Sequence, residues 1–275
     1  MNRLPQQALH YNNELKVCVG GIVVSIRCKD REFIDFLRSR YRDFITGLIP
    51  VVSINMNDQP PQQDLPEVED LSRIKNISLE GKILRIEGDI FSSFLDMDAH
   101  QGEISQPLIF QPLDMFIYIT TFLYLLKEGA FFLHASGIIQ SYHSYLFFGP
   151  SGSGKSTIAT ISNGRAFAED IVLIKREASG YYHAYGTPFS EGKNLSAPIK
   201  GMFRLRKADR NDLSILSPGM AVREVMDNIP FSFINTDVIK NSFDAVFNLI
   251  KDVPCHDLHF MPDKSFWEVI KEHIK

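Results

Sequence analysis

The sequence contains one complete phosphate-loop pattern, G-x-x-x-x-G-K-[ST], and no other feature restricts the possible folds as strongly. The pattern covers residues 149–156 and reads GPSGSGKS. An apolar run at residues 145–148 predicts a strand before it, and residues 156–161 predict a helix after it. Glycines let backbone N–H groups converge on phosphate oxygens, and the start of a helix attracts the same anion. The pattern therefore predicts an α/β unit that binds nucleotide or phosphate.

The loop residues have separate expected tasks. Lys155 can reach the β- and γ-phosphates, and the hydroxyl of Ser156 can ligate Mg²⁺. A Gly/Ser-rich turn could match the pattern by accident, but the strand and helix on either side favour the functional interpretation. The expected cofactors are ATP, or another nucleoside triphosphate, and Mg²⁺. The predicted nucleotide-binding residues are Gly149, Ser151, Gly152, Ser153, Gly154, Lys155, Ser156 and Thr157.

An acidic pair, Glu169-Asp170, follows the loop at a distance that leaves room for one short helix and one turn. The pair can therefore return beside the phosphate loop. One carboxylate could hold Mg²⁺, and the other could take a proton from an attacking hydroxyl. Adjacent residues of a regular strand point to opposite faces, so two roles at one site require a strand end or a bend. The alternative is a solvated acidic turn.

His134 lies in an otherwise apolar stretch upstream of the loop. A histidine in such surroundings is most often a residue of the core or of a sheet edge. The functional alternative is that His134 orients an acidic base or neutralises charge at the γ-phosphate.

The chain divides into two expected domains. Residues 1–105 predict a small α+β unit, with β structure over residues 15–26 that a bulge or turn at Gly20-Gly21 interrupts, a helix capped by Asp30 and a hairpin over residues 74–86. Residues 58–70 are rich in Pro, Gln and acidic side chains and predict an exposed linker. Residues 106–275 predict the phosphate-loop domain, built on a mixed sheet.

Charge and cysteine content exclude some classes of protein. The 29 basic and 33 acidic residues give a net charge of −4, without the basic excess expected of a nucleic-acid partner. Three widely spaced cysteines suggest free thiols in a reducing compartment. The start of the sequence lacks the apolar stretch of a secretory signal, and the apolar run 115–126 is too short to span a bilayer. We expect a cytoplasmic protein without a membrane partner, and a buried helix at 115–126.

Three motifs together resemble the HPr kinase/phosphorylase family and its divergent relatives. They are HASG from His134, GPSGSGKST from Gly149 and AED from Ala168. The segment YGTPF at residues 185–189 and the C-terminal residues from Val253 are also similar to the divergent members. The resemblance implies a phosphoenolpyruvate carboxykinase-like P-loop fold. It further implies an ATP-dependent kinase that phosphorylates a serine-type hydroxyl of a peptide, small protein or small molecule, with a homo-oligomer as an option.

The resemblance also assigns roles. His134 matches the family histidine that assists the catalytic acid, and Glu169 stands where the family has its catalytic aspartate. Asp170 matches the second aspartate and, with Ser156, is the expected metal group. The predicted catalytic residues are therefore His134, Lys155 and Glu169.

Two other functions remain open at this point. A transport-type ATPase would carry an LSGGQ-like signature downstream, and the sequence has none. The chain could also be a nucleotide-binding module without catalytic activity, in which Glu169 would be a catalytic base that has lost its role. A turnover assay distinguishes such a module from a kinase.

Two further clusters invite interpretation. Arg204 and Arg206 would share one face of a strand, where they could contact phosphate, an acidic substrate or only solvent. Cys255, His256 and His259 do not converge on one face of a strand, so they do not predict a metal site.

Overall fold

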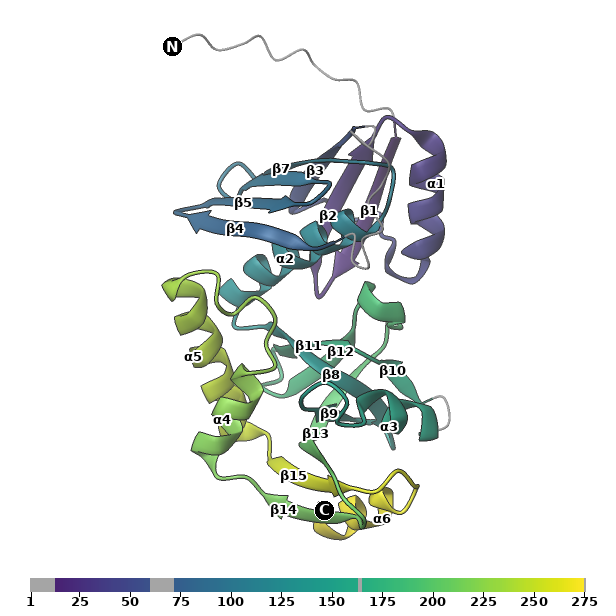
Figure 1. Ribbon diagram of the computed structural model, residues 1–275, viewed down its shortest axis with the longest axis vertical. Coiled ribbons are helices and arrows are strands. Elements are labelled where there is room, and N and C mark those ends of the chain that lie inside the picture. Colours follow the sequence, from purple (N-terminus) through teal and green to yellow (C-terminus); the bar gives the residue numbers. More distant parts are fainter. Residues whose placement is uncertain (1–12, 60–71, 163–164, 275) are drawn as a thin grey trace. The chain divides into compact units, whose positions relative to one another are not determined.

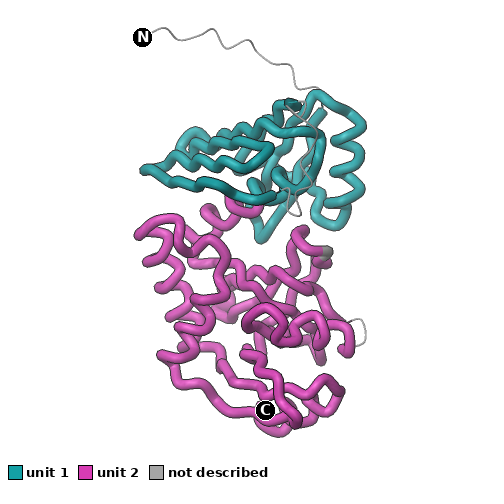
Figure 2. Tube along the Cα trace, in the orientation of Figure 1, with its two compact units in different colours: residues 1–117 teal, residues 118–275 magenta. Residues whose placement is uncertain are grey.

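The computed structural model describes residues 13–59, 72–162 and 165–274. The chain forms two compact units, Met1–Ile117 and Tyr118–Lys275 (Figure 2). Each unit is built on a mixed β-sheet with helices, which confirms the expected α/β class.

Unit 1 is a sheet of seven described strands with the order β1-β2-β3-β7-β6-β5-β4. The neighbours β2, β3 and β7 run parallel, and the other pairs are antiparallel. Its elements are β1 (Asn13–Val19), β2 (Ile22–Cys28), α1 (Arg31–Arg40), β3 (Val52–Asp58), β4 (Ile74–Glu80), β5 (Ile83–Gly88), β6 (Ser92–Asp96), β7 (Gln101–Gln106) and the start of α2 (Gln111–Lys127).

Local sequence signals explain several elements of unit 1. Gly20 and Gly21 both have positive φ and form the tight turn between β1 and β2, so of the two predicted options, bulge or turn, the structure has the turn. The side chain of Asp30 accepts a hydrogen bond from the backbone N–H of Phe33 at 2.7 Å, which confirms the predicted helix cap. Strands β6 and β7 have no counterpart in the sequence-based prediction.

The division between the units lies inside α2, whereas the sequence places it at residue 106. The first turns of α2 belong to unit 1 because Asp114 pairs there with Arg40 and Tyr41. None of the described helices, α2 included, is long and apolar enough to cross a membrane. The predicted linker 58–70 lies outside the described residues except for its first two positions.

Unit 2 contains the predicted phosphate loop. Its elements are the rest of α2, β8 (Phe131–Gln140), β9 (His143–Phe148), α3 (Lys155–Ile161), β10 (Ala166–Ala168), β11 (Ile171–Arg176), β12 (Tyr182–Gly186), β13 (Ser196–Lys207), β14 (Asp212–Ile215), α4 (Pro218–Met226), α5 (Thr236–Asp252), β15 (Cys255–Phe260) and α6 (Phe266–His273) (Figure 1). The strand order is β10-β8-β11-β12-β13-β15-β14, and β9 pairs with both β8 and β13. The pairings β8–β11–β12–β13–β9 therefore return to β8.

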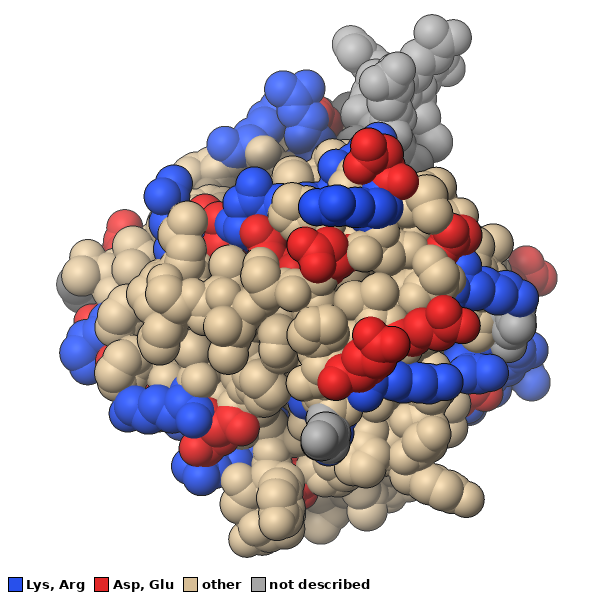
Figure 3. Space-filling view, turned by 90° about the horizontal axis from the view of Figure 1, so that it is seen from below, with Lys and Arg blue, Asp and Glu red and all other residues tan. Residues whose placement is uncertain are grey.

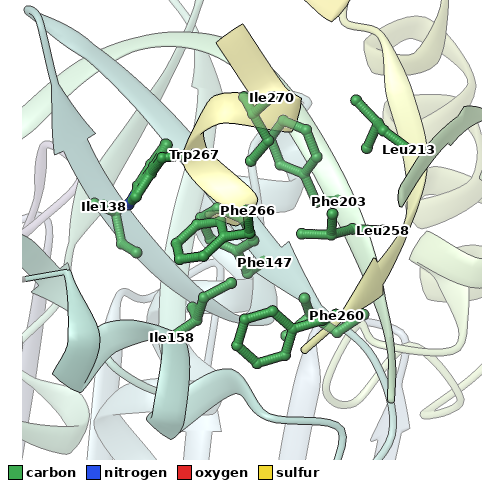
Figure 4. Packing of buried hydrophobic residues seen from close by; sticks show 11 residues of the cluster. Ile138, Phe147, Ile158, Phe203, Leu213, Leu258, Phe260, Phe266, Trp267 and Ile270 are labelled. Carbon is green, nitrogen blue, oxygen red and sulfur yellow. The ribbon is translucent and has the colours of Figure 1, made fainter. Parts of the chain in front are cut away.

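An aromatic cluster packs the C-terminal helix of unit 2 onto the sheet. Phe147 of β9 and Phe203 of β13 have ring centroids 5.1 Å apart, and Phe266 of α6 meets Phe147 edge to face. Ile158 from α3 belongs to the same buried cluster (Figure 4). These contacts hold the strand before the phosphate loop and the helix after it in one core.

Candidate functional site

The strand β9 leads directly into the phosphate loop, and its neighbours determine what lies on either side. Phe148, the last residue of β9, is paired with Ala135 of β8 on one side and Arg204 of β13 on the other. Because β9, β13 and β15 are parallel, their carboxyl ends lie at one edge of the sheet. Ligands of α/β sheets commonly bind at this edge.

The loop has the backbone conformation that its glycines predict. Gly149, Gly152 and Gly154 have φ values of 145°, 76° and 112°, a region that side chains with a Cβ rarely adopt. A Cβ on Gly154 would also lie 3.0 Å from the ring of Phe260. The helix α3 begins at Lys155, so the predicted order of strand, loop and helix is confirmed.

Lys155 folds back over its own loop. Its Nζ donates hydrogen bonds to the carbonyl oxygens of Gly149 at 2.8 Å and Pro150 at 3.2 Å. Burial lowers the pKa of Lys155, while the negative charge of Asp170 acts in the opposite direction. The ammonium group therefore lies in the electrostatic field of Asp170.

The acidic pair occupies a bend. Glu169 and Asp170 lie between two short strands, β10 and β11. Both strands pair with the same side of β8, and the register shifts at β10. The bend satisfies the condition that two adjacent carboxylates serve one site.

Asp170 is the carboxylate that His134 contacts. The Nε2 atom of His134 lies 3.0 Å from Oδ1 of Asp170, and the hydroxyl of Ser190 donates to Oδ2 at 3.3 Å. The hydrogen bond from His134 is the largest effect that lowers the pKa of Asp170; Ser190 and the charge of Lys155 act in the same direction. The sequence expects His134 to assist Glu169, whose side chain is exposed.

We expect His134→Ala to raise the pKa of Asp170 toward the ordinary aspartate value. The reason is that the substitution removes the hydrogen bond that most favours the ionised carboxylate. In the variant, the carboxylate would therefore become protonated at a higher pH than in the wild-type chain. Titration of the Asp170 carboxyl carbon by NMR measures the change, and an unaltered midpoint would contradict the contact.

Ser136 connects the phosphate loop to the acidic bend. Its hydroxyl is fully buried and lies 3.0 Å from the carbonyl oxygen of Lys155 and 2.9 Å from that of Glu169, both hydrogen-bond acceptors. One short side chain on β8 thus links the first residue of α3 to the residue before Asp170. Ser136 is part of the HASG motif, and its residue type alone does not indicate this bridge.

Ser136→Ala should lower the free energy of unfolding by about 1–3 kcal/mol, because it removes the buried donor that the carbonyl groups of Lys155 and Glu169 share. Urea denaturation of both proteins measures this loss. A change below about 0.5 kcal/mol, the range of ordinary surface substitutions, would show that the bridge contributes little.

Tyr118 is a neighbour of the site that the sequence does not reveal. Its ring packs against Phe132 and Phe189, and its buried hydroxyl has no hydrogen-bond partner among the described residues. Burial raises the pKa of Tyr118, and the charge of Asp170 adds to the effect. The residue belongs to an apolar helix, where its sequence surroundings give no functional signal.

The arrangement fits Mg²⁺ better than a metal held entirely by protein. Ser156 and the acidic pair offer hard oxygen donors, and Mg²⁺ usually binds one or two carboxylates together with water and substrate phosphates. Within the described ranges, no group of three or more His, Cys, Asp or Glu residues could hold a metal ion. Cys255 and His256 are buried while His259 is exposed, so the described part of the chain also gives no convergence there.

The described charges are mixed at the surface. On the face in Figure 3, basic and acidic side chains are interspersed. In comparisons with known proteins, no family model and no curated protein matched the chain. The resemblance to HPr kinases therefore rests on the motifs, and the site rests on its own geometry.

Proposed function

We propose that the chain is an ATP-dependent kinase that transfers the γ-phosphoryl group to a serine-type hydroxyl. The acceptor would be a peptide, a small protein or a small molecule. The observation that carries the proposal is the His134–Asp170 pair, which lies in the electrostatic range of Lys155 at the phosphate loop. A structural loop would need neither a paired carboxylate nor a lysine beside it.

Positioning and neutralisation of charge would supply most of the rate. The loop amides and the Lys155 ammonium would hold the β- and γ-phosphates, once nucleotide displaces Nζ from the carbonyls of Gly149 and Pro150. Ser156, with a carboxylate of the bend, would hold Mg²⁺, which neutralises phosphate charge when bound.

The contact of His134 favours Asp170 as the proton acceptor. The resemblance assigns to the histidine the task of assisting the catalytic acid, and in this chain His134 reaches Asp170. We therefore exchange the roles that the sequence suggests: Asp170 accepts the proton of the attacking hydroxyl, and Glu169 is the carboxylate on the metal side.

Glu169→Gln should raise the Mg²⁺ concentration for half-maximal activity by about 10-fold or more, as expected when a group that supports a metal ion is lost. The maximal rate at saturating Mg²⁺ should change less than in Asp170→Asn. A Mg²⁺ titration of activity makes the measurement. A large loss of maximal rate with unaltered Mg²⁺ dependence would return the base role to Glu169.

The function itself can be tested with γ-labelled ATP, Mg²⁺ and a pool of serine-containing peptides, with free serine included. We expect label on an acceptor with the wild-type chain and none with Lys155→Ala. Label released only as inorganic phosphate would indicate an ATPase. Nucleotide binding without turnover would indicate a binding module.

We also propose that unit 2 has a phosphoenolpyruvate carboxykinase-like P-loop fold. What supports this is the phosphate loop between β9 and α3 in a mixed sheet, with the acidic bend on the strands next to β8. A measured structure of unit 2 with bound nucleotide would test the likeness.

A further inference from the structure

A cavity lies beside the phosphate loop, on the side away from His134. Its volume is about 540 Å³, and residues 150–153 of the loop, residues 204–207 of β13 and Glu224 of α4 line it. This volume is within the range of small-molecule sites. The catalytic roles proposed above use none of the β13 or α4 residues.

A network of ion pairs forms the wall of the cavity. Arg204, which is 5% exposed, donates from Nε and Nη2 to the two carboxylate oxygens of Asp257 at 2.8 and 2.6 Å. Its Nη1 contacts Glu224. The Nε atom of Arg206 also donates to Asp257, at 3.0 Å, while half of the Arg206 side chain stays exposed. This confirms that both arginines share one face of β13.

The network favours a ligand without charge at this wall. Within the network, two guanidinium groups face two carboxylates, so their charges balance and a polyanion would gain little from the arginines; Lys207 adds one exposed positive charge to the lining. The exposed plane of Arg206 can instead stack on a flat ring. On the loop side, Ser153 is 6% exposed, and its hydroxyl is buried and has no hydrogen-bond partner among the described residues.

The direction of phosphoryl transfer indicates which part of a bound nucleotide would occupy the cavity. The attacking oxygen and the leaving oxygen are roughly in line across the γ-phosphorus. Phe148 lies at the entrance to the loop, between β8, which carries His134, and β13, which carries Arg204. The two side strands therefore place His134 and Arg204 on opposite sides of the loop entrance. If the hydroxyl attacks from the His134–Asp170 side, the leaving nucleoside diphosphate extends toward the cavity.

We propose that this cavity holds the nucleoside part of the phosphate donor, with the guanidinium of Arg206 stacked on the base. The proposal rests on the proposed function, because it requires the phosphates of the same nucleotide on the loop. It implies a donor that is a nucleoside triphosphate and not a bare polyphosphate.

Calorimetric titration with MgATP and with magnesium tripolyphosphate tests the proposal. The wild-type chain should bind MgATP more tightly than magnesium tripolyphosphate. Arg206→Ala should weaken MgATP by about 2- to 30-fold, the range of a lost cation–π contact, and leave tripolyphosphate affinity unchanged. Arg206→Lys keeps the positive charge but removes the planar guanidinium group, so the variant should have lost part of its affinity for MgATP. Arg210→Ala removes an exposed positive charge outside the cavity lining and should alter neither affinity.

Three outcomes would overturn the nucleoside subsite alone. Arg206→Ala could lower the affinity for both ligands equally, it could lower neither affinity, or the wild-type chain could bind both ligands with equal affinity. Lys155→Ala should lower the affinity for both ligands. If Lys155→Ala lowers neither affinity, the proposed phosphate-loop function fails and the subsite fails with it, so the two failures are distinguishable.

Discussion

Lys155→Ala should reduce the affinity for MgATP by about 10- to 150-fold, which corresponds to the loss of hydrogen bonds to a charged group. Phosphoryl transfer at saturating nucleotide should fall by a further factor of about 10²–10³, because the ammonium stabilises charge that develops on the phosphate. Calorimetry gives the first value and single-turnover transfer gives the second.

Two controls make the Lys155 result specific. Circular dichroism should show the same secondary structure in both proteins, since Nζ hydrogen-bonds to the carbonyls of Gly149 and Pro150 within the loop itself. Lys271→Ala removes the same side chain from an exposed position of α6 and should change neither affinity nor rate. Equal MgATP affinity in Lys155→Ala would contradict the assignment of the phosphate loop.

Asp170→Asn should reduce the rate of transfer by about 10²–10⁴-fold, the usual effect of removing a general base. The affinity for MgATP should change much less, because in our assignment Asp170 acts on the attacking hydroxyl. Single-turnover transfer from γ-labelled ATP, with affinity measured separately, distinguishes these effects.

Glu169→Gln is the matched comparison for Asp170→Asn, since both remove one negative charge from the same bend. If Asp170→Asn abolishes the Mg²⁺ dependence of nucleotide binding and Glu169→Gln stops transfer, the roles are those expected from sequence alone. The pKa of Asp170 lies below its ordinary value, so the carboxylate remains ionised throughout the neutral range. Protonation of Asp170 would end its role as a base, so we expect activity to fall on the acidic side at a pH below the ordinary pKa of aspartate.

Elements with strong local signals could be predicted from the sequence. Asp30 caps α1 as expected, and the hairpin predicted over residues 74–86 forms from β4 and β5. The order of strand, phosphate loop and helix also follows from neighbouring residues, because the glycines and the apolar run specify it locally. These features depend on contacts within a few residues.

Features that depend on pairing between distant segments could not be predicted. The partner of His134 is set by the register of β8 against β11, where His134 lies opposite Ile171. A shift of one residue would turn the histidine to the other face of the sheet. The buried positions of Ser136 and Tyr118 follow from the same long-range packing, and neither residue type signals it.

The hydroxyl bridge of Ser136 makes the two halves of the site thermodynamically dependent on each other. In the proposed kinase, a nucleotide that moved the backbone at Lys155 would also shift the hydrogen bond to Glu169, and an acceptor that moved the bend would act on the loop. Linkage makes such coupling reciprocal: the factor by which one ligand changes the affinity of the other is the same in both directions. Under the proposed function, a single buried serine would make the binding of the two substrates cooperative without any movement of whole domains.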